Sequence, residues 1–122
     1  MDTILLIEDN VDQRKVIVEM LKNGTPCSII EAEDGEEGLE LFKEHDVDIL
    51  ICDLALPKLN GLDVIEEIKE QAPKTSILAI SGGTALALND YIRIQEEKIA
   101  VTLSKPFTMD QLNSALEESL KL

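Results

Sequence analysis

Five short apolar runs are separated by longer stretches with helical spacing. The apolar runs are rich in Ile, Leu and Val and show little polar alternation, which is typical of strands covered on both faces. They are Ile4–Ile7, Cys27–Ile30, Asp48–Cys52, Ser76–Ile80 and Ala100–Leu103. Each run therefore predicts a strand of a buried parallel sheet.

The stretches between these runs place apolar residues three and four positions apart, as on one face of a helix. They are Val11–Leu21, Glu36–Phe42, Leu62–Lys69, Ala85–Glu96 and Met109–Leu120. Thr108 is a suitable N-cap for the last of them. Asp34-Gly35 and Asn60-Gly61 are turn signals between elements. The order predicts an α/β fold, (βα)5, with a parallel five-stranded sheet and helices on both faces.

Composition fits a single folded domain over residues 1–122, because 44% of the residues are hydrophobic. Aromatic residues make up only 2%, so we expect an aliphatic core. The 25 acidic residues outnumber the 11 basic ones and give a net charge of −14. A surface of this sign repels nucleic-acid phosphates and attracts cations and basic partners. We therefore expect no direct nucleic-acid binding.

The two cysteines, Cys27 and Cys52, lie in apolar runs, which favours buried thiols in a reducing compartment over a disulfide. The N-terminus lacks the basic region of a signal peptide, and no apolar stretch approaches the roughly 20 residues of a membrane span. We expect a soluble, cytoplasmic protein without membrane contact. Because the sequence stops as the fifth predicted helix ends, we also expect a stand-alone domain.

Polar residues follow four of the five predicted strands. Glu8 and Asp9 follow the first, Asp53 the third, Ser81 the fourth and Lys105 the fifth. The carboxyl ends of parallel strands share one edge of the sheet, where ligands bind in open α/β folds. Three carboxylates gathered there would favour a divalent cation such as Mg²⁺.

These residue types together suit a phosphoaspartate site. Asp53 can act as a nucleophile toward phosphorus and form an acyl phosphate. Lys105 offers a positive charge to phosphoryl oxygens, and the Ser81 hydroxyl can donate a hydrogen bond. Each residue alone is common in a loop, where acidic residues cap turns and Ser or Lys-Pro occurs by chance. Their occurrence at successive strand ends favours the functional interpretation.

In four stretches the chain resembles the receiver domain of two-component response regulators. The stretches are ILLIEDN (4–10), ICDLALPKLNGLD (51–63), ILAISGG (77–83) and LSKPF (103–107). Pro57 and Gly61 stand four and eight residues after Asp53, as in the family pattern. The resemblance covers essentially the whole chain. It implies a flavodoxin-like three-layer sandwich with strand order 2-1-3-4-5.

By this resemblance, Asp53 is the phosphoacceptor. The resemblance also implies that Glu8, Asp9, Asp53 and the backbone carbonyl of Ala55 hold Mg²⁺ or Mn²⁺. Ser81 and Lys105 would contact the phosphoryl group. A domain of this family is no enzyme beyond catalysing its own aspartyl phosphorylation and dephosphorylation.

The resemblance also implies partners and a switch region. A sensor histidine kinase or phosphotransfer protein would donate the phosphoryl group, and a downstream protein would respond. A homodimer is a further expectation. The change would pass through residues 82–105, with Ser81, Gly82 and Thr102 as switch residues. Thr102 stands where many receivers carry Tyr or Phe, so the usual aromatic rotation is not available.

Two alternatives stay open. Thr102 and Ala55 depart from the common family pattern and motivate a receiver-fold interaction module that works without phosphorylation. An enzyme or cofactor protein on the same fold is the other. A flavodoxin needs a phosphate-binding loop after the first strand, where Glu8-Asp9-Asn10 would repel phosphate. A phosphatase of the haloacid dehalogenase type needs an Asp at the position of Ala55.

Overall fold

The computed structural model describes residues 2–24, 26–82 and 85–121, in which strands and helices alternate. The elements are β1 (Asp2–Ile7), α1 (Val11–Lys22), β2 (Cys27–Ala32), α2 (Gly35–Glu44), β3 (Ile49–Asp53), α3 (Gly61–Gln71), β4 (Ser76–Ser81), α4 (Ala85–Glu97), β5 (Val101–Ser104) and α5 (Met109–Ser119). This order confirms the predicted (βα)5 arrangement.

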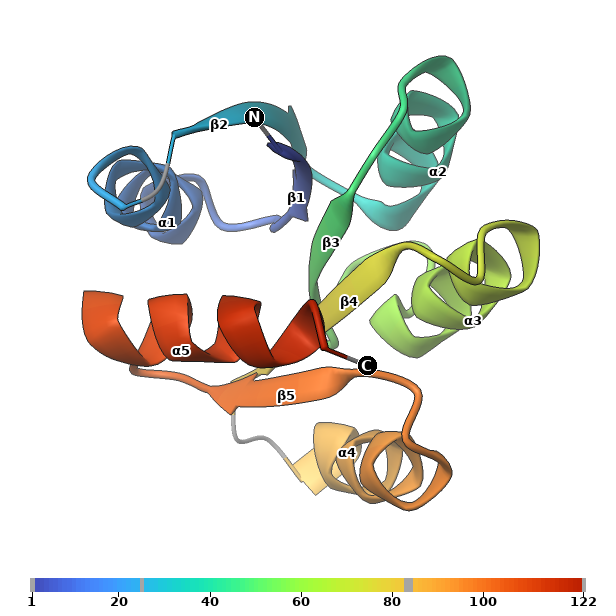
Figure 1. Cartoon of the computed structure of the whole chain (residues 1–122). Helices are drawn as coiled ribbons and strands as arrows, with labels where there is room; N and C mark the ends of the chain where they lie inside the picture. Colours follow the sequence, from blue (N-terminus) through green and yellow to red (C-terminus); the bar gives the residue numbers. More distant parts are fainter. Residues whose placement is uncertain (1, 25, 83–84, 122) are drawn as a thin grey trace.

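The five strands form one parallel sheet in the order β2-β1-β3-β4-β5. Helices α1 and α5 cover one face of the sheet, and α2, α3 and α4 lie on the other (Figure 1). The molecule is therefore the predicted flavodoxin-like sandwich of three layers. Because every strand runs in the same direction, the carboxyl ends of β1, β3, β4 and β5 meet at one edge.

The core consists of two aliphatic clusters, one on each face of the sheet. Leu5 and Leu50 pack with Ile65 of α3 on one face. Leu6 packs with Ile17 of α1 on the other. All five of these side chains are at most 3% exposed, and burial of one such side chain contributes about 1.5–3 kcal/mol. Burial on both faces explains why these strands lack polar alternation.

Four strands extend further toward the carboxyl edge than the apolar runs predict, because β2 ends at Ala32, β3 at Asp53, β4 at Ser81 and β5 at Ser104. Asp53 is the last residue of β3 and pairs with Ile80, and Ser81 is the last residue of β4 and pairs with Ser104. The parallel ladder continues past the apolar run because backbone pairing does not depend on side-chain polarity. These polar residues are therefore held by the sheet rather than by loops.

Side-chain caps fix the starts of four helices. Asn10, Asp34 and Asn60 each accept a hydrogen bond from a backbone N–H in the first turn of α1, α2 and α3. Thr108 does the same for α5 and forms a reciprocal capping box with Gln111, which confirms the predicted N-cap. Such caps satisfy backbone donors that the helix leaves free.

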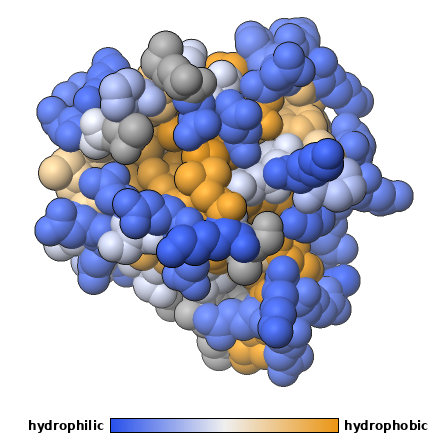
Figure 2. Space-filling model, viewed as in Figure 1, coloured by the Kyte–Doolittle hydropathy of each residue, from blue (hydrophilic) through white to orange (hydrophobic). Residues whose placement is uncertain are grey.

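The surface seen in Figure 2 is mostly polar, with an apolar hollow near the end of α5. A cavity of about 120 Å³ lies there, with Ile4, Leu21, Cys27, Ile49 and Leu116 in its lining. It lies toward the amino ends of the strands, away from the site described below. Over the described ranges, none of the helices has both the length and the apolar character needed to cross a membrane.

Candidate functional site

A cavity of about 500 Å³ opens at the carboxyl edge of the sheet. Its lining includes Glu8, Asp9, Asp53, Ala55, Gly82 and Lys105. These residues come from the ends of β1, β3, β4 and β5 and from the segments that follow them. The predicted convergence of strand-end residues is therefore present in the fold.

Three carboxylates meet in this cavity. One oxygen each from Glu8, Asp9 and Asp53 can be chosen so that all three lie within 4.8 Å of one another. Glu8 is 1% and Asp53 4% exposed, whereas Asp9 is exposed to solvent. Hard oxygen ligands at such spacing suit Mg²⁺.

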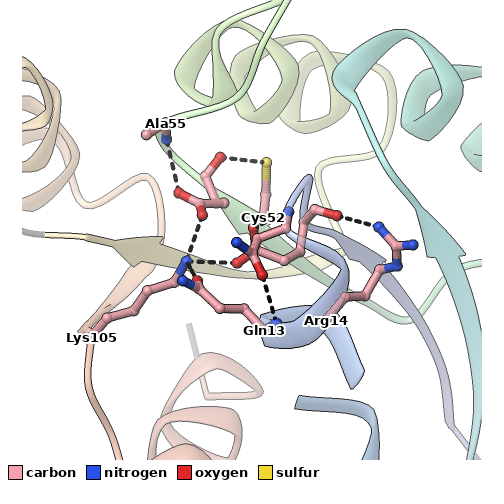
Figure 3. Close-up of polar contacts among 8 residues, drawn as sticks. Gln13, Arg14, Cys52, Ala55 and Lys105 are labelled. Atoms are coloured by element: carbon pink, nitrogen blue, oxygen red, sulfur yellow. Dashed lines mark hydrogen bonds and ion pairs between the residues drawn. The ribbon is translucent and has the colours of Figure 1, made fainter. Parts of the chain in front are cut away.

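The side chain of Lys105 reaches into this acidic cluster. Its Nζ atom donates to Oε1 of Glu8 at 2.6 Å and to Oδ2 of Asp53 at 2.7 Å. It also donates to Oε1 of Gln13. Figure 3 shows the Lys105 side chain with dashed lines that mark the contacts of its ammonium, the one to Gln13 among them. The ammonium partly compensates the negative charge of the two buried carboxylates, Glu8 and Asp53.

Both oxygens of Asp53 are held by donors. Oδ1 accepts from the backbone N–H of Ala55 at 2.9 Å, and Oδ2 accepts from Lys105. Gly61 supports this arrangement, because an added Cβ would stand 2.1 Å from the Asp53 carbonyl oxygen and 2.7 Å from Cα of Leu54. The close approach of α3 to the end of β3 therefore requires glycine at this position.

Glu8 is the most deeply buried of the three acids. Burial, together with the charge of Asp53, raises the pKa of Glu8 above its usual range, although hydrogen bonds from Lys105 and Asn10 act in the other direction. Burial lowers the pKa of Lys105, but the hydrogen bonds and charges of Asp53 and Glu8 outweigh it and the pKa is raised. Lys105 is therefore a cation at neutral pH.

Two predicted switch residues lie beside the cavity rather than in its lining. Ser81 is 6% exposed at the end of β4, and its backbone carbonyl accepts from the N–H of Lys105 at 2.8 Å. Thr102 lies within β5, where its Oγ1 atom accepts from Nε2 of Gln95 in α4 at 3.4 Å. Residues 83 and 84, part of the predicted switch segment 82–105, lie outside the described residues.

The sequence patterns did not single out three neighbours of the site. Gln13 contacts Lys105, Arg14 donates to the backbone carbonyl of Glu8 at 2.7 Å, and the backbone N–H of Asn10 donates to the Glu8 carboxylate at 3.2 Å. A signal was available, because α1 starts directly after the acidic pair and its first turn must lie over the same edge.

Comparison with known proteins gives one family for the chain. The model of the response regulator receiver domain matches residues 4–117. The chain is 30% identical over 119 residues to the chemotaxis protein CheY of Bacillus subtilis and covers 96% of each sequence. It is 33% identical over 114 residues to the autoinducer 1 sensor kinase/phosphatase LuxN of Vibrio harveyi. That match covers 93% of this chain but spans only 13% of LuxN.

Among solved structures, the response regulator protein TrrA of Thermotoga maritima, in complex with Mg²⁺–BeF, is similar to this fold. Its TM-score is 0.83 at 27% identity, with 98% of this chain and 100% of that chain covered. The family match, the relatives and the strand order agree. The chain therefore belongs to the response regulator receiver domains, the signalling switches of two-component systems.

Proposed function

We propose that this chain is the phosphoryl-accepting switch of a two-component phosphorelay, with Asp53 as the acceptor. The observation that carries the proposal is the Lys105 ammonium, 2.7 Å from Oδ2 of Asp53, in a cavity shared with Glu8 and Asp9. A carboxylate fixed by two donors is preorganised for attack, because little rearrangement is needed to present an oxygen to phosphorus.

The reaction would depend on a divalent cation. Glu8, Asp9, Asp53 and the backbone carbonyl of Ala55 would hold Mg²⁺ or Mn²⁺. The donor set fits, because three carboxylate oxygens lie within 4.8 Å of one another and two of them belong to the buried side chains of Glu8 and Asp53. When bound, the cation neutralises charge on the transferring phosphoryl group.

The protein side chains have separate tasks in the transfer. An oxygen of Asp53 forms the new bond to phosphorus while the bond from phosphorus to the donor nitrogen or oxygen breaks, and the electron pair of that bond stays with the donor. Lys105 already contacts the acceptor and would bind a phosphoryl oxygen. The Ser81 hydroxyl would donate to another. Water would later attack the phosphorus, the bond from phosphorus to the Asp53 oxygen would break, and inorganic phosphate would leave Asp53 as the free carboxylate.

The donor would be a sensor histidine kinase or a phosphotransfer protein. An apolar groove of about 320 Å³ lies next to the acidic cavity, lined in part by Val16, Met20 and Phe107 and reaching Lys105. Val16 is 54% exposed. A protein that packs against this groove would bring a phosphohistidine close to Asp53. A small phosphodonor could not be held near Asp53 by apolar contact of this kind.

The signal would leave through residues 82–105 and change the affinity for a downstream protein. In the described part of this segment, polar contacts join α4 to its neighbours: Asn60–Asp90 at 3.4 Å, Arg93–Glu66 at 3.2 Å and Gln95–Thr102 at 3.4 Å. Such partly exposed contacts contribute little free energy each, so a local change at Lys105 can redistribute them.

The test is incubation with acetyl phosphate and Mg²⁺, followed by intact-mass measurement. We expect the wild type to gain one phosphoryl group that hydroxylamine removes, and Asp53→Asn to gain none. Asp46→Asn, at an exposed position away from the site, is the matched control and should label like the wild type. Absent labelling, or equal labelling of Asp53→Asn, would contradict the proposal.

The same variants address the interaction module that works without phosphorylation. If a downstream partner binds wild type and Asp53→Asn equally, with and without acetyl phosphate, the phosphorylation-independent function is favoured. A partner affinity that changes only in the phosphorylated wild type supports the switch.

A further inference from the structure

Gln13 lies where the acidic cavity meets the apolar groove, and it lines both. It belongs to the first turn of α1, and its backbone N–H donates to Oδ1 of Asn10 at 2.9 Å. Its side-chain Oε1 atom accepts a hydrogen bond from Nζ of Lys105. Figure 3 shows the Gln13 side chain reaching from α1 to the lysine.

This contact completes the hydrogen bonding of the lysine. An ammonium group has three N–H donors, and here they have three acceptors: Glu8, Asp53 and Gln13. The Lys105 side chain is 20% exposed and has a flexible four-carbon stem, so solvent competes for its head group. Of the three residues that accept from the ammonium, Gln13 is exposed, whereas Glu8 and Asp53 are buried.

We propose that Gln13 is a positioning residue that holds the Lys105 ammonium against Asp53 and thereby sets the rate of phosphoryl transfer to Asp53. The inference rests on the proposed function. Gln13 acts through Lys105 and not on the phosphoryl group itself. Its amide oxygen is neutral, so it restrains the lysine without adding a further negative charge that would repel an anionic donor.

The side chain of Gln13 is not needed to form α1. The start of the helix is capped by the side chain of Asn10, which accepts from the backbone N–H at position 13 whatever side chain is there. The helix is anchored by the buried Ile17, Val18 and Leu21. Substitution of the exposed Gln13 side chain therefore tests the contact with Lys105 rather than the folding of α1.

The first experiment measures hydrogen exchange of the Lys105 ammonium by NMR, on unphosphorylated, metal-free protein labelled with ¹⁵N-lysine. We expect exchange to be about fivefold faster in Gln13→Met, as for the loss of one hydrogen bond. Gln13→Glu, which keeps an acceptor, should retain slow exchange. Lys15→Met, an exposed substitution on the same helix, is the matched control and should leave the Lys105 signal unchanged.

The second experiment measures phosphorylation of the same variants by acetyl phosphate and Mg²⁺. We expect Gln13→Met to react about fivefold more slowly at an unchanged melting temperature, and Lys15→Met to react like the wild type. Unchanged ammonium exchange in Gln13→Met would overturn the inference, whatever its phosphorylation rate. Wild-type protein that takes no label would instead contradict the proposed function, because the exchange measurement does not need phosphorylation.

Discussion

Nζ of Lys105 lies 2.7 Å from Oδ2 of Asp53, although 52 positions separate the two residues in the chain. The parallel sheet brings them together, because β3 and β5 both pair with β4 and end at the same edge. The ammonium thus already occupies the acidic site that we propose for a divalent cation. Lysine and metal should therefore compete for the same carboxylates.

Replacing Lys105 by Met should tighten Mg²⁺ binding and slow phosphorylation at the same time. Removal of a positive charge next to the carboxylates should raise the Mg²⁺ affinity roughly tenfold, while loss of the ammonium removes a partner of the phosphoryl group. Isothermal titration calorimetry gives the affinity. Lys105→Arg keeps the charge and should bind Mg²⁺ much like the wild type. Weaker Mg²⁺ binding by Lys105→Met would contradict this competition.

Gly61→Ala should destabilise the fold and displace the acceptor. The new Cβ would stand 2.1 Å from the carbonyl oxygen of Asp53, which is backbone and has little freedom to move. We expect a loss of at least about 2 kcal/mol in the free energy of unfolding, measured by urea denaturation. Gly82→Ala is the control, because a Cβ there meets no atom within 4 Å. Equal stability of the two variants would show that α3 can shift away.

Glu8 should make stability fall with rising pH in the absence of metal. Its folded-state pKa is raised above 4.5, so the folded protein binds this proton more tightly than the unfolded chain. The contribution of Glu8 to the free energy of unfolding is then fully present below about pH 4.5. It declines as the pH rises through the raised pKa. Glu8→Gln should remove this decline, as measured by urea denaturation at several pH values in EDTA. Glu19→Gln, an exposed change in α1, should keep the wild-type slope.

Gln95→Met should loosen α4 from the sheet. The change removes the hydrogen bond from Nε2 of Gln95 to Oγ1 of Thr102, which joins α4 to β5. We expect faster amide hydrogen exchange in α4, followed by mass spectrometry. Gln71→Met removes a comparable exposed contact, from Gln71 to Glu67 within α3, and should leave exchange in α4 unchanged. The contact has no role in holding α4 if both variants exchange alike.

The fold was predictable because its central strands are buried on both faces. Ile4–Ile7 and Ile49–Asp53 are buried at every position, so the apolar runs stand out in the sequence. The meeting of Glu8, Asp53 and Lys105 follows from parallel order alone, which needs no side-chain detail. The strand ends were less predictable, because Asp53 and Ser81 extend the ladder by backbone pairing.

The contacts around the lysine were not predictable in the same way. The third N–H of the Lys105 ammonium donates to Gln13 of α1. This contact depends on the path of α1 over the sheet edge, and no pattern of residue types specifies that path. The contact between Gln95 and Thr102 is a similar case, because it joins α4 to β5, which belong to different layers of the fold. Contacts between different layers need coordinates, whereas the order of layers follows from periodicity.

The acceptor, the acidic pair and the lysine all lie on strand ends or directly after them, whereas the groove proposed for the donor includes the outer face of α1. Helix faces can therefore diverge, or be exchanged by an engineer who wants to redirect the protein to another donor, while the chemistry is retained. Gln13 limits this freedom, because it belongs to α1 and yet contacts Lys105. A transplanted α1 should keep glutamine at position 13, since otherwise a change of partner would also change the reaction rate.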